Sequence, residues 1–177
     1  MGDDYRSNNG GGVYVLTEGK EGDIMNLTPA QVEKLVKWAA QECEWQMSGE
    51  QSVARLVEAY FYLAEVGIVT ASTIIELGFI VEPSLNTPSH WRTVNVRVGM
   101  SVKPKWENVQ RLMEIWLEDI SDSGAYSPTE MFEDFEEIHP FRDGNGRVGA
   151  LLFNWWSDTY APDDLQFPPN LWNDPRR

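Results

Sequence analysis

Cysteine is almost absent from this chain, which contains only Cys43. A single thiol cannot form an internal disulfide, and it cannot supply the paired ligands of a cysteine-based zinc site. We therefore expect Cys43 to be a small apolar residue packed on a helix. Long apolar runs are also missing, and no charged-then-apolar leader is visible. These absences predict a cytoplasmic protein with no membrane partner.

Positive charge is scarce as well, since 14 Lys and Arg residues stand against 28 Asp and Glu residues, for a formal net charge of -14. Such a chain has no broad basic surface for a polyanion, so we expect no nucleic-acid partner. A nucleotide would need a local positive site. The length of 177 residues and the hydrophobic fraction of 42% suit one ordinary core and leave too little chain for two.

One short segment, from His139 to Arg147, concentrates the chemically useful residues. Pro140 and the run Gly144-Asn145-Gly146 predict a loop, because two glycines permit positive φ and let several backbone N–H groups point at one spot. A helix is predicted next, since apolar side chains recur at helical spacing at Val148, Leu151, Leu152, Trp155 and Trp156. A glycine-rich loop that leads into a helix N-terminus is suited to bind phosphate.

The polar side chains of this segment fit phosphate chemistry. Arg147, in the first turn of the expected helix, is a forked cation that can hold phosphate oxygens at two points. Asp143 offers a hard oxygen ligand, and a carboxylate beside a phosphate site favours Mg²⁺. His139 can move a proton near neutral pH. A base, a metal ligand and an anion site are therefore expected within one loop.

The order of these residues resembles the signature of the Fic family, His-Pro-Phe-x-Asp/Glu-Gly-Asn-Gly-Arg-x-x-Arg. Every fixed position from His139 to Arg147 matches, and the final arginine is replaced by Ala150. The resemblance implies an all-α, Fic-type helical bundle with a small β-hairpin, the flap, next to the active-site loop. It also implies a protein adenylyltransferase, which moves AMP from ATP to a Ser, Thr or Tyr hydroxyl of a target protein and uses Mg²⁺.

The resemblance also implies a role for each residue of the segment. His139 would deprotonate the target hydroxyl, and Asp143 would hold Mg²⁺ on the α- and β-phosphates of ATP. Phe141 would turn inward as an anchor. The nucleotide phosphates would be bound by Gly144, Asn145, Gly146 and Arg147.

Ala150 leaves two alternatives open. In the family the missing arginine reaches the terminal phosphates, and a lost charge-assisted contact costs about 1.5 to 3 kcal/mol, which weakens binding without abolishing it. On an ideal helix, position 150 lies on the same side as Arg147. Doc-type members also lack this arginine and transfer phosphate, so a Doc-like protein phosphotransferase is one alternative. A degenerate Fic fold that binds a nucleotide or a partner without turnover is the other.

The flap is expected shortly before the signature. Residues 94, 96 and 98 are valines that alternate with polar neighbours, which is typical of a half-exposed strand, and Gly99 and Met100 can turn it back as a hairpin. In Fic proteins a hairpin in this place docks the target by strand addition, and Trp91-Arg92-Thr93 resembles its usual start. The alternative is an edge strand with no partner. The docking residues expected here are Thr93, Val94, Asn95 and Val96.

Capping residues and helical spacing predict the remaining elements. Helices are expected over 29–46, from a cap at Ser48 to Gly67, from Thr70 to Gly78, over 105–120, and from Ser127 to His139, with a short strand at 13–16. The acidic face of the helix before His139 is interpreted as solvated, and any acid that approached His139 would raise its pKa; these residues are Glu133, Asp134, Glu136 and Glu137. The expected organisation is a partly disordered tail over 1–26, a Fic-type domain over 27–160 and a Pro-rich strap over 161–177.

Overall fold

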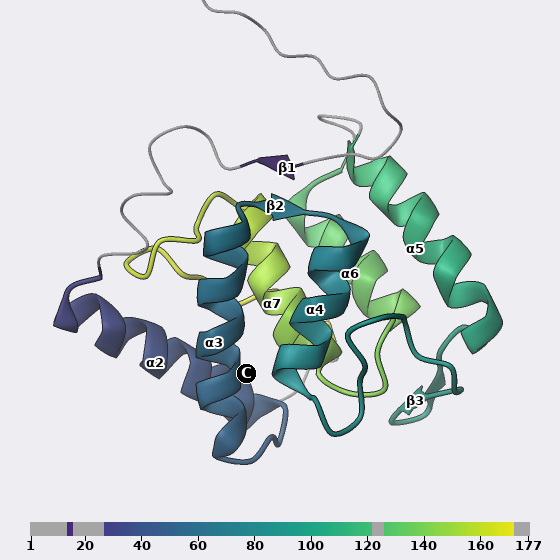
Figure 1. The fold of residues 1–177 in the computed structure, drawn as a ribbon, viewed down its shortest axis with the longest axis horizontal. Helices are drawn as coiled ribbons and strands as arrows, with labels where there is room; N and C mark the ends of the chain where they lie inside the picture. The colour runs from purple at the N-terminus through teal and green to yellow at the C-terminus, as the bar shows by residue number, and fades with distance from the viewer. Residues whose placement is uncertain (1–13, 16–26, 122–125, 172–177) are drawn as a thin grey trace, which may run out of the picture.

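The computed structural model describes residues 14–15, 27–121 and 126–171. Within them lie six helices and two small antiparallel sheets, so the predicted all-α class with a small hairpin is confirmed (Figure 1). The tail expected over 1–26 lies outside the described residues apart from 14–15. The helices are α2 (Pro29–Trp45), α3 (Gln51–Val66), α4 (Ala71–Val81), α5 (Trp106–Ser121), α6 (Pro128–Ile138) and α7 (Asn145–Trp156).

Helix α7 is the central element of the bundle. Every residue from Arg147 to Trp155 is buried, because α7 packs against α2, α4 and α6 on different sides (Figure 1). A helix that is apolar nearly all round is stable only inside a core. The N-terminal end of α7 carries the signature loop, so the core of the protein fixes the position of that loop.

The capping predictions hold at most helix ends. Capping boxes at Thr28 and Ser127 open α2 and α6, and Gly67, with φ of 68°, ends α3 in the left-handed conformation. The cap expected at Ser48 is wrong: α3 begins after Glu50, and no side chain accepts a hydrogen bond from its first turn.

The expected end of the third helix at Gly78 is also wrong, since α4 continues to Val81. Gly78 serves close packing instead of helix termination. A Cβ atom at this position would lie 2.2 Å from Cε1 of Phe141, so only glycine lets the phenylalanine ring rest on the helix backbone.

Both sheets are two-stranded and antiparallel. The predicted N-terminal strand is present as β1 (Tyr14–Val15), which pairs with β2 (Ile68–Val69). The hairpin consists of β3 (Arg97–Val98) and β4 (Ser101–Val102), joined by a turn in which Gly99 has φ of 56°. The strand predicted from residue 94 is shorter than expected, because groups of residues 94 and 95 are hydrogen-bonded outside the hairpin.

The C-terminal segment runs over the bundle without regular structure as far as Leu171. Tyr60 of α3 and Tyr160 anchor its start: their rings stack at 4.5 Å, and each hydroxyl donates to the other residue's carbonyl oxygen, at 2.7 and 2.9 Å. Further on, the backbone of Gln166 bonds to the side chains of Trp38 and Asn154. The segment is thus tied to α2, α3 and α7.

Candidate active site

The signature forms a tight loop between two helix ends. His139 caps α6 in the left-handed conformation, with φ of 53°, and Gly144 opens α7 with φ of 82°. A side chain at Gly144 would be strained by this backbone and would also meet Val81 at 2.9 Å. The two turns reverse the chain so that His139 stands beside the N-terminus of α7.

Two asparagine side chains hold the loop in this shape. Asn145 accepts from the backbone N–H of Phe141 at 2.8 Å and donates to the carbonyl oxygen of the same residue at 3.0 Å. Asn86 donates to the carbonyl oxygens of Gly78 and Asp143, and accepts from the backbone N–H of residue 142. These two side chains therefore form hydrogen bonds with backbone groups of the loop that no helix or sheet pairs.

Phe141 turns inward, as expected of an anchor. Its side chain is buried against Gly78, and its ring centroid lies 5.8 Å from that of Trp91 and 6.4 Å from that of Phe135. These aromatic contacts join the loop to α4, α6 and the segment before the hairpin. Movement of the loop would thus disturb the core.

Arg92 connects the base of the hairpin to the loop. Its buried guanidinium donates to the carbonyl oxygens of His139, Ile138, Val94 and Pro104. Its own backbone N–H donates to the carbonyl oxygen of Pro140 at 2.9 Å. A planar fork with several donors can satisfy such a set of acceptors, which an ammonium group cannot do in the same geometry.

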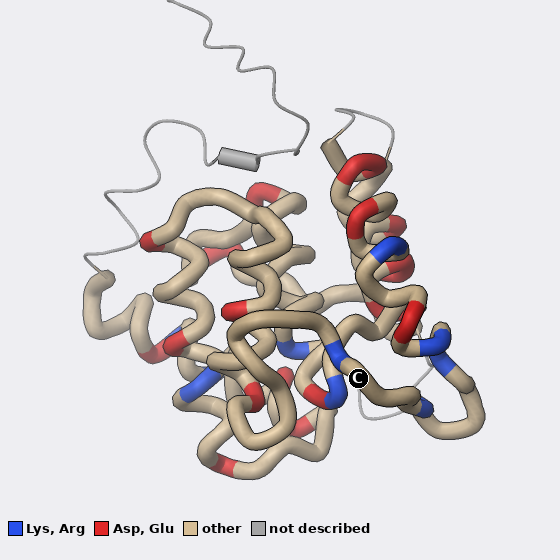
Figure 2. Tube along the Cα trace, turned by 45° about the vertical axis from the view of Figure 1, so that its right-hand side comes forward, with Lys and Arg blue, Asp and Glu red and all other residues tan. Residues whose placement is uncertain are grey.

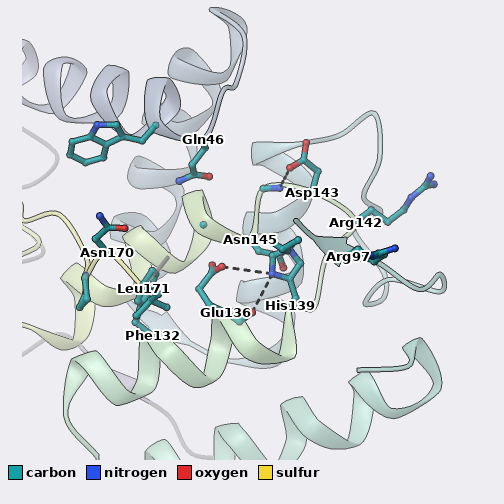
Figure 3. A pocket seen from close by; sticks show the side chains of 15 residues that line it. Gln46, Arg97, Phe132, Glu136, His139, Arg142, Asp143, Asn145, Asn170 and Leu171 are labelled. Carbon is teal, nitrogen blue, oxygen red and sulfur yellow. Dashed lines mark hydrogen bonds and ion pairs between the residues drawn. The ribbon is translucent and has the colours of Figure 1, made fainter. Parts of the chain in front are cut away.

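A pocket of about 420 Å³ lies over the loop (Figure 3). It brings together five of the residues that the sequence singled out: His139, Asp143, Gly144, Asn145 and Gly146. Its other walls come from the C-terminal end of α2, from α6, from the hairpin and from the C-terminal segment; they include Trp45, Gln46, Arg97, Val98, Phe132, Glu136, Arg142, Pro169, Asn170 and Leu171.

His139 is held in its neutral form. Burial lowers its pKa to about 4, with help from the nearby charges of Lys103 and Arg92, and this outweighs the hydrogen bond to the Glu136 backbone. His139 Nδ1 lies 3.3 Å from the carbonyl oxygen of Glu136. Because a carbonyl oxygen only accepts, Nδ1 carries the proton and Nε2 keeps a lone pair. The imidazole is therefore ready to accept a proton at neutral pH.

Glu136 corrects the interpretation of the acidic helix face. It is 5% exposed, and its Oε2 lies 3.7 Å from His139 Nδ1, so it belongs to the pocket wall rather than to the solvated surface. Burial has the larger effect on the pKa of His139, which falls, although the negative charge of Glu137 does raise this pKa, as expected of a nearby acid. Glu133, Asp134 and Glu137 are exposed, as expected.

Asp143 stands at the mouth of the pocket with its side chain 58% exposed. Its Oδ1 accepts a 2.6 Å hydrogen bond from the backbone N–H of Gly144. The described part of the chain contains no group of three or more His, Cys, Asp or Glu side chains that could hold a metal by themselves. A single accessible carboxylate nevertheless fits Mg²⁺ that arrives with phosphates, since this ion keeps few protein ligands.

Arg147 lies beneath the loop rather than in the pocket wall. Its side chain is 2% exposed; Nη2 lies 3.6 Å from Glu82 Oε2 and 3.7 Å from Asp143 Oδ1, and Nη1 donates to the carbonyl oxygen of Val81. Ala150 is fully buried and does not line the pocket either. The exposed cations at the pocket are instead Arg97 and Arg142, which the sequence had not singled out.

The residues predicted to dock the target lie in the segment before β3. Thr93, Val94 and Asn95 are exposed and Val96 is partly exposed, but none of them lines the pocket. Asn95 accepts from the backbone N–H of Trp106 and so caps the start of α5. The part of the hairpin that reaches the pocket is β3 itself.

Comparisons with known proteins identify the family and the fold. The Fic/DOC family model matches residues 69–157, which is half of the chain and includes the whole signature. No curated protein matches. A Fic family protein from Desulfovibrio desulfuricans G20 is similar in structure, with 20% identity and a TM-score of 0.62 over 78% of this chain and 54% of its own. This likeness shows the fold, and the chain spans about half the length of that protein.

A Fic domain containing signaling protein from Bacteroides thetaiotaomicron VPI-5482 also matches, with 18% identity and a TM-score of 0.48 over 80% of this chain and 70% of its own. The family match covers α4 to α7, the hairpin and the loop that carries His139. The chain belongs to the Fic/DOC family.

Proposed function

We propose that this protein is a Mg²⁺-dependent protein adenylyltransferase, which moves AMP from ATP to a Ser, Thr or Tyr hydroxyl of a target protein. One observation carries the proposal: a neutral His139 shares a pocket with Asp143 and with the glycine-rich N-terminus of α7. A base, a carboxylate for a metal and an anion site are the parts that phosphoryl transfer requires.

In this mechanism Nε2 of His139 accepts the proton of the target hydroxyl. The hydroxyl oxygen then attacks the α-phosphorus, and the bond from that phosphorus to the oxygen shared with the β-phosphorus breaks, so pyrophosphate leaves. Backbone N–H groups at Asn145 and Gly146 stabilise the charge on the transferred group, aided by the helix dipole, while that of Gly144 already donates to Asp143 Oδ1. Mg²⁺ held by Asp143 would neutralise charge on the leaving phosphates.

Arg147 acts on the phosphates through the loop in this proposal. Its guanidinium is shared between Glu82 and Asp143, so it holds the metal-binding carboxylate in place and contributes positive charge behind the anion site. Asn145 works in the same way, because both ends of its amide are bonded to Phe141. In this proposal the backbone of residues 144–146 lines the anion site, and the side chains of Asn145 and Arg147 hold that backbone in position.

We further propose that residues 27–160 form the Fic-type unit, that 161–177 act as a strap along it, and that the hairpin with residues 93–96 docks the target. The mutual bonds of Tyr60 and Tyr160 support the first boundary, and Pro169 to Leu171 bring the strap to the pocket. Each strand of the two-stranded hairpin has an edge that pairs with no described strand, which suits strand addition.

A Doc-like phosphotransferase is the second candidate, and the arginines favour it. Ala150 supplies no cation, and Arg147 is engaged by Glu82, so neither position offers a free guanidinium to the terminal phosphates of ATP. If ATP bound in the reverse direction, its γ-phosphate would lie at the anion site beside His139. His139 would then deprotonate the target hydroxyl for attack on the γ-phosphorus, and ADP would leave.

Intact-mass spectrometry of host-cell proteins incubated with the protein, ATP and Mg²⁺ tests both candidates. We expect a mass gain equal to AMP that is lost in His139→Ala and on removal of Mg²⁺ with a chelator. His90→Ala is the matched control, since His90 lies outside this pocket, and it should keep the gain. A gain equal to phosphate would establish the Doc-like reaction. No gain with any common nucleotide would leave a non-catalytic binding module.

A further inference from the structure

The hairpin region has a charge opposite to that of the rest of the chain. Between Pro83 and Trp106 there are four Lys and Arg residues and no Asp or Glu, in a protein whose net charge is -14. Figure 2 shows blue positions gathered on the hairpin side and red positions spread over the helices. A locally positive surface on an acidic protein is suited to bind a negatively charged partner.

Two of these four cations have structural tasks. Arg92 is buried and bonded to backbone carbonyls, and Lys103 is 2% exposed and lies 2.9 Å from Glu137. The other two, Arg97 and Lys105, are exposed. Only Arg97 of this pair lines the pocket, and the signature loop adds a second exposed arginine there, Arg142.

Arg97 and Arg142 come from different segments and line the pocket on the same side of His139. In Figure 3 they lie beyond His139 from Asn170 and Leu171, on the hairpin side, and the Arg142 side chain points out of the pocket. Neither arginine forms an ion pair with any residue that the structure describes. Their guanidinium groups are thus available to a partner at the entrance rather than to a molecule deep in the pocket.

Apolar exposure at the hairpin favours a peptide segment as this partner. Val94, Met100 and Val102 are 39%, 90% and 69% exposed and lie in the two-stranded sheet or next to it in the chain. A nucleotide phosphate does not bind to apolar side chains. An extended peptide can bury its own apolar residues against them while its backbone pairs with a strand edge. Charge and apolar surface therefore occur together beside β3.

We propose that Arg97 and Arg142 select a target segment that carries Asp or Glu beside the hydroxyl to be modified. This inference rests on the proposed transfer to a protein hydroxyl and adds the chemistry of the target. Bidentate contacts from two arginines would place an acidic side chain on the hairpin side of His139 and so hold the neighbouring hydroxyl near Nε2.

Selection of peptides from a displayed random library tests the proposal without any turnover. The wild-type protein is used without ATP, beside Arg97→Glu/Arg142→Glu and a milder Arg97→Gln/Arg142→Gln variant. Arg111→Glu is the matched control, since Arg111 is exposed on α5 and lies outside the pocket. Binding of selected peptides is then measured at low and high salt, and Mg²⁺-ATP binding is measured for every variant.

We expect the wild type and Arg111→Glu to enrich peptides with Asp or Glu next to Ser, Thr or Tyr. The charge-reversed variant should bind them about tenfold more weakly and lose the acidic preference, with an intermediate loss in the glutamine variant and weaker binding at high salt. Enrichment that ignores charge, no enrichment at all, or an equal loss in Arg111→Glu would overturn the proposal. So would a loss confined to ATP binding, which would assign the arginines to the nucleotide. Failure of the transfer reaction would appear separately, in the mass experiment.

Discussion

Arg92 Nε donates a 2.8 Å hydrogen bond to the carbonyl oxygen of His139, which lies 47 positions further along the chain. The bond fixes the residue that we assign as the base to the segment that starts the hairpin. In the proposed function, target docking and proton acceptance would be coupled through this side chain, because a shift of the hairpin base would move the backbone of His139.

Replacement of Arg92 should therefore affect stability and activity together. Arg92→Met leaves the carbonyl oxygens of residues 94, 104, 138 and 139 without this donor in a buried place, and we expect a loss of about 3 kcal/mol in the free energy of unfolding. Arg92→Lys should recover only part of it, since an ammonium lacks the fork. Urea unfolding measures the stability of the two variants, and intact-mass spectrometry measures their transfer activity. Equal stability of Arg92→Met and wild type would contradict this role.

Gly78→Ala tests the packing of the signature loop on α4, where the ring of Phe141 rests on Gly78. The new methyl group would overlap the buried ring of Phe141, so we expect a loss of about 2 kcal/mol and a fall in transfer activity as the loop shifts. Gly49→Ala is the matched control, because a Cβ there has no neighbour within 4 Å among the described residues. Thermal unfolding of the two variants should separate them clearly, and similar melting temperatures would reject the packing argument.

Glu82→Gln tests the ion pair beneath the loop. It keeps the shape of Glu82 but removes the main counter-charge of Arg147, whose Nε has no hydrogen-bond partner in the described structure. We expect destabilisation of about 2 kcal/mol or more, because a buried cation is left undercompensated. Asp163→Asn is the control: its partner Lys34 lies at 2.5 Å, but both side chains are exposed, so denaturant unfolding should be unchanged.

The pH dependence of transfer should reflect the low pKa of His139. The neutral form persists down to about pH 4, so the acidic limb of kcat/KM should lie far below the usual histidine range. NMR titration provides the direct measurement. The chain has two histidines, and His139→Asn removes one ring signal and so assigns the other. An acidic limb and a ring titration near pH 6.5 would show that His139 is not desolvated in solution.

The same group makes stability depend on pH. The unfolded histidine takes up its proton near pH 6.5, whereas folded His139 does so only near pH 4. Stability attributed to the neutral imidazole is therefore complete above pH 6.5 and is lost as the pH falls to 4, by up to about 3 kcal/mol. Unfolding curves across this range, compared with His139→Asn, measure the difference. A variant with the same acid sensitivity as wild type would place the effect elsewhere.

Local sequence signals were sufficient for much of the fold. The capping boxes at Thr28 and Ser127, and the apolar spacing of α7, act within a few residues, and their predictions are confirmed. The signature loop could be found for the same reason, since its glycines and its histidine are adjacent in the chain. The roles assigned to these residues stay predictions until transfer is measured.

The contacts that hold the signature loop in place could not be predicted from the sequence, because they join segments that are distant in the chain. Asn86 meets residue 142 across 56 positions, and nothing in its neighbourhood marks it as a loop partner. Glu136 is buried close to Gly149 of α7, where an added Cβ would lie 3.3 Å from Glu136 Oε1. Sequence spacing shows which side of a helix a residue occupies, but not which helix lies opposite.

The hairpin between Arg97 and Val102 is fastened at its base and open at its tip. Arg92 fixes the base to the loop, while Gly99 has open space where a Cβ would stand and Met100 is 90% exposed. We therefore expect changes at the tip to leave the signature loop in place. Residues 97–102 could therefore be replaced by the hairpin of a relative. In the proposed function, such a graft would change the preferred target and keep the signature loop and its residues unchanged.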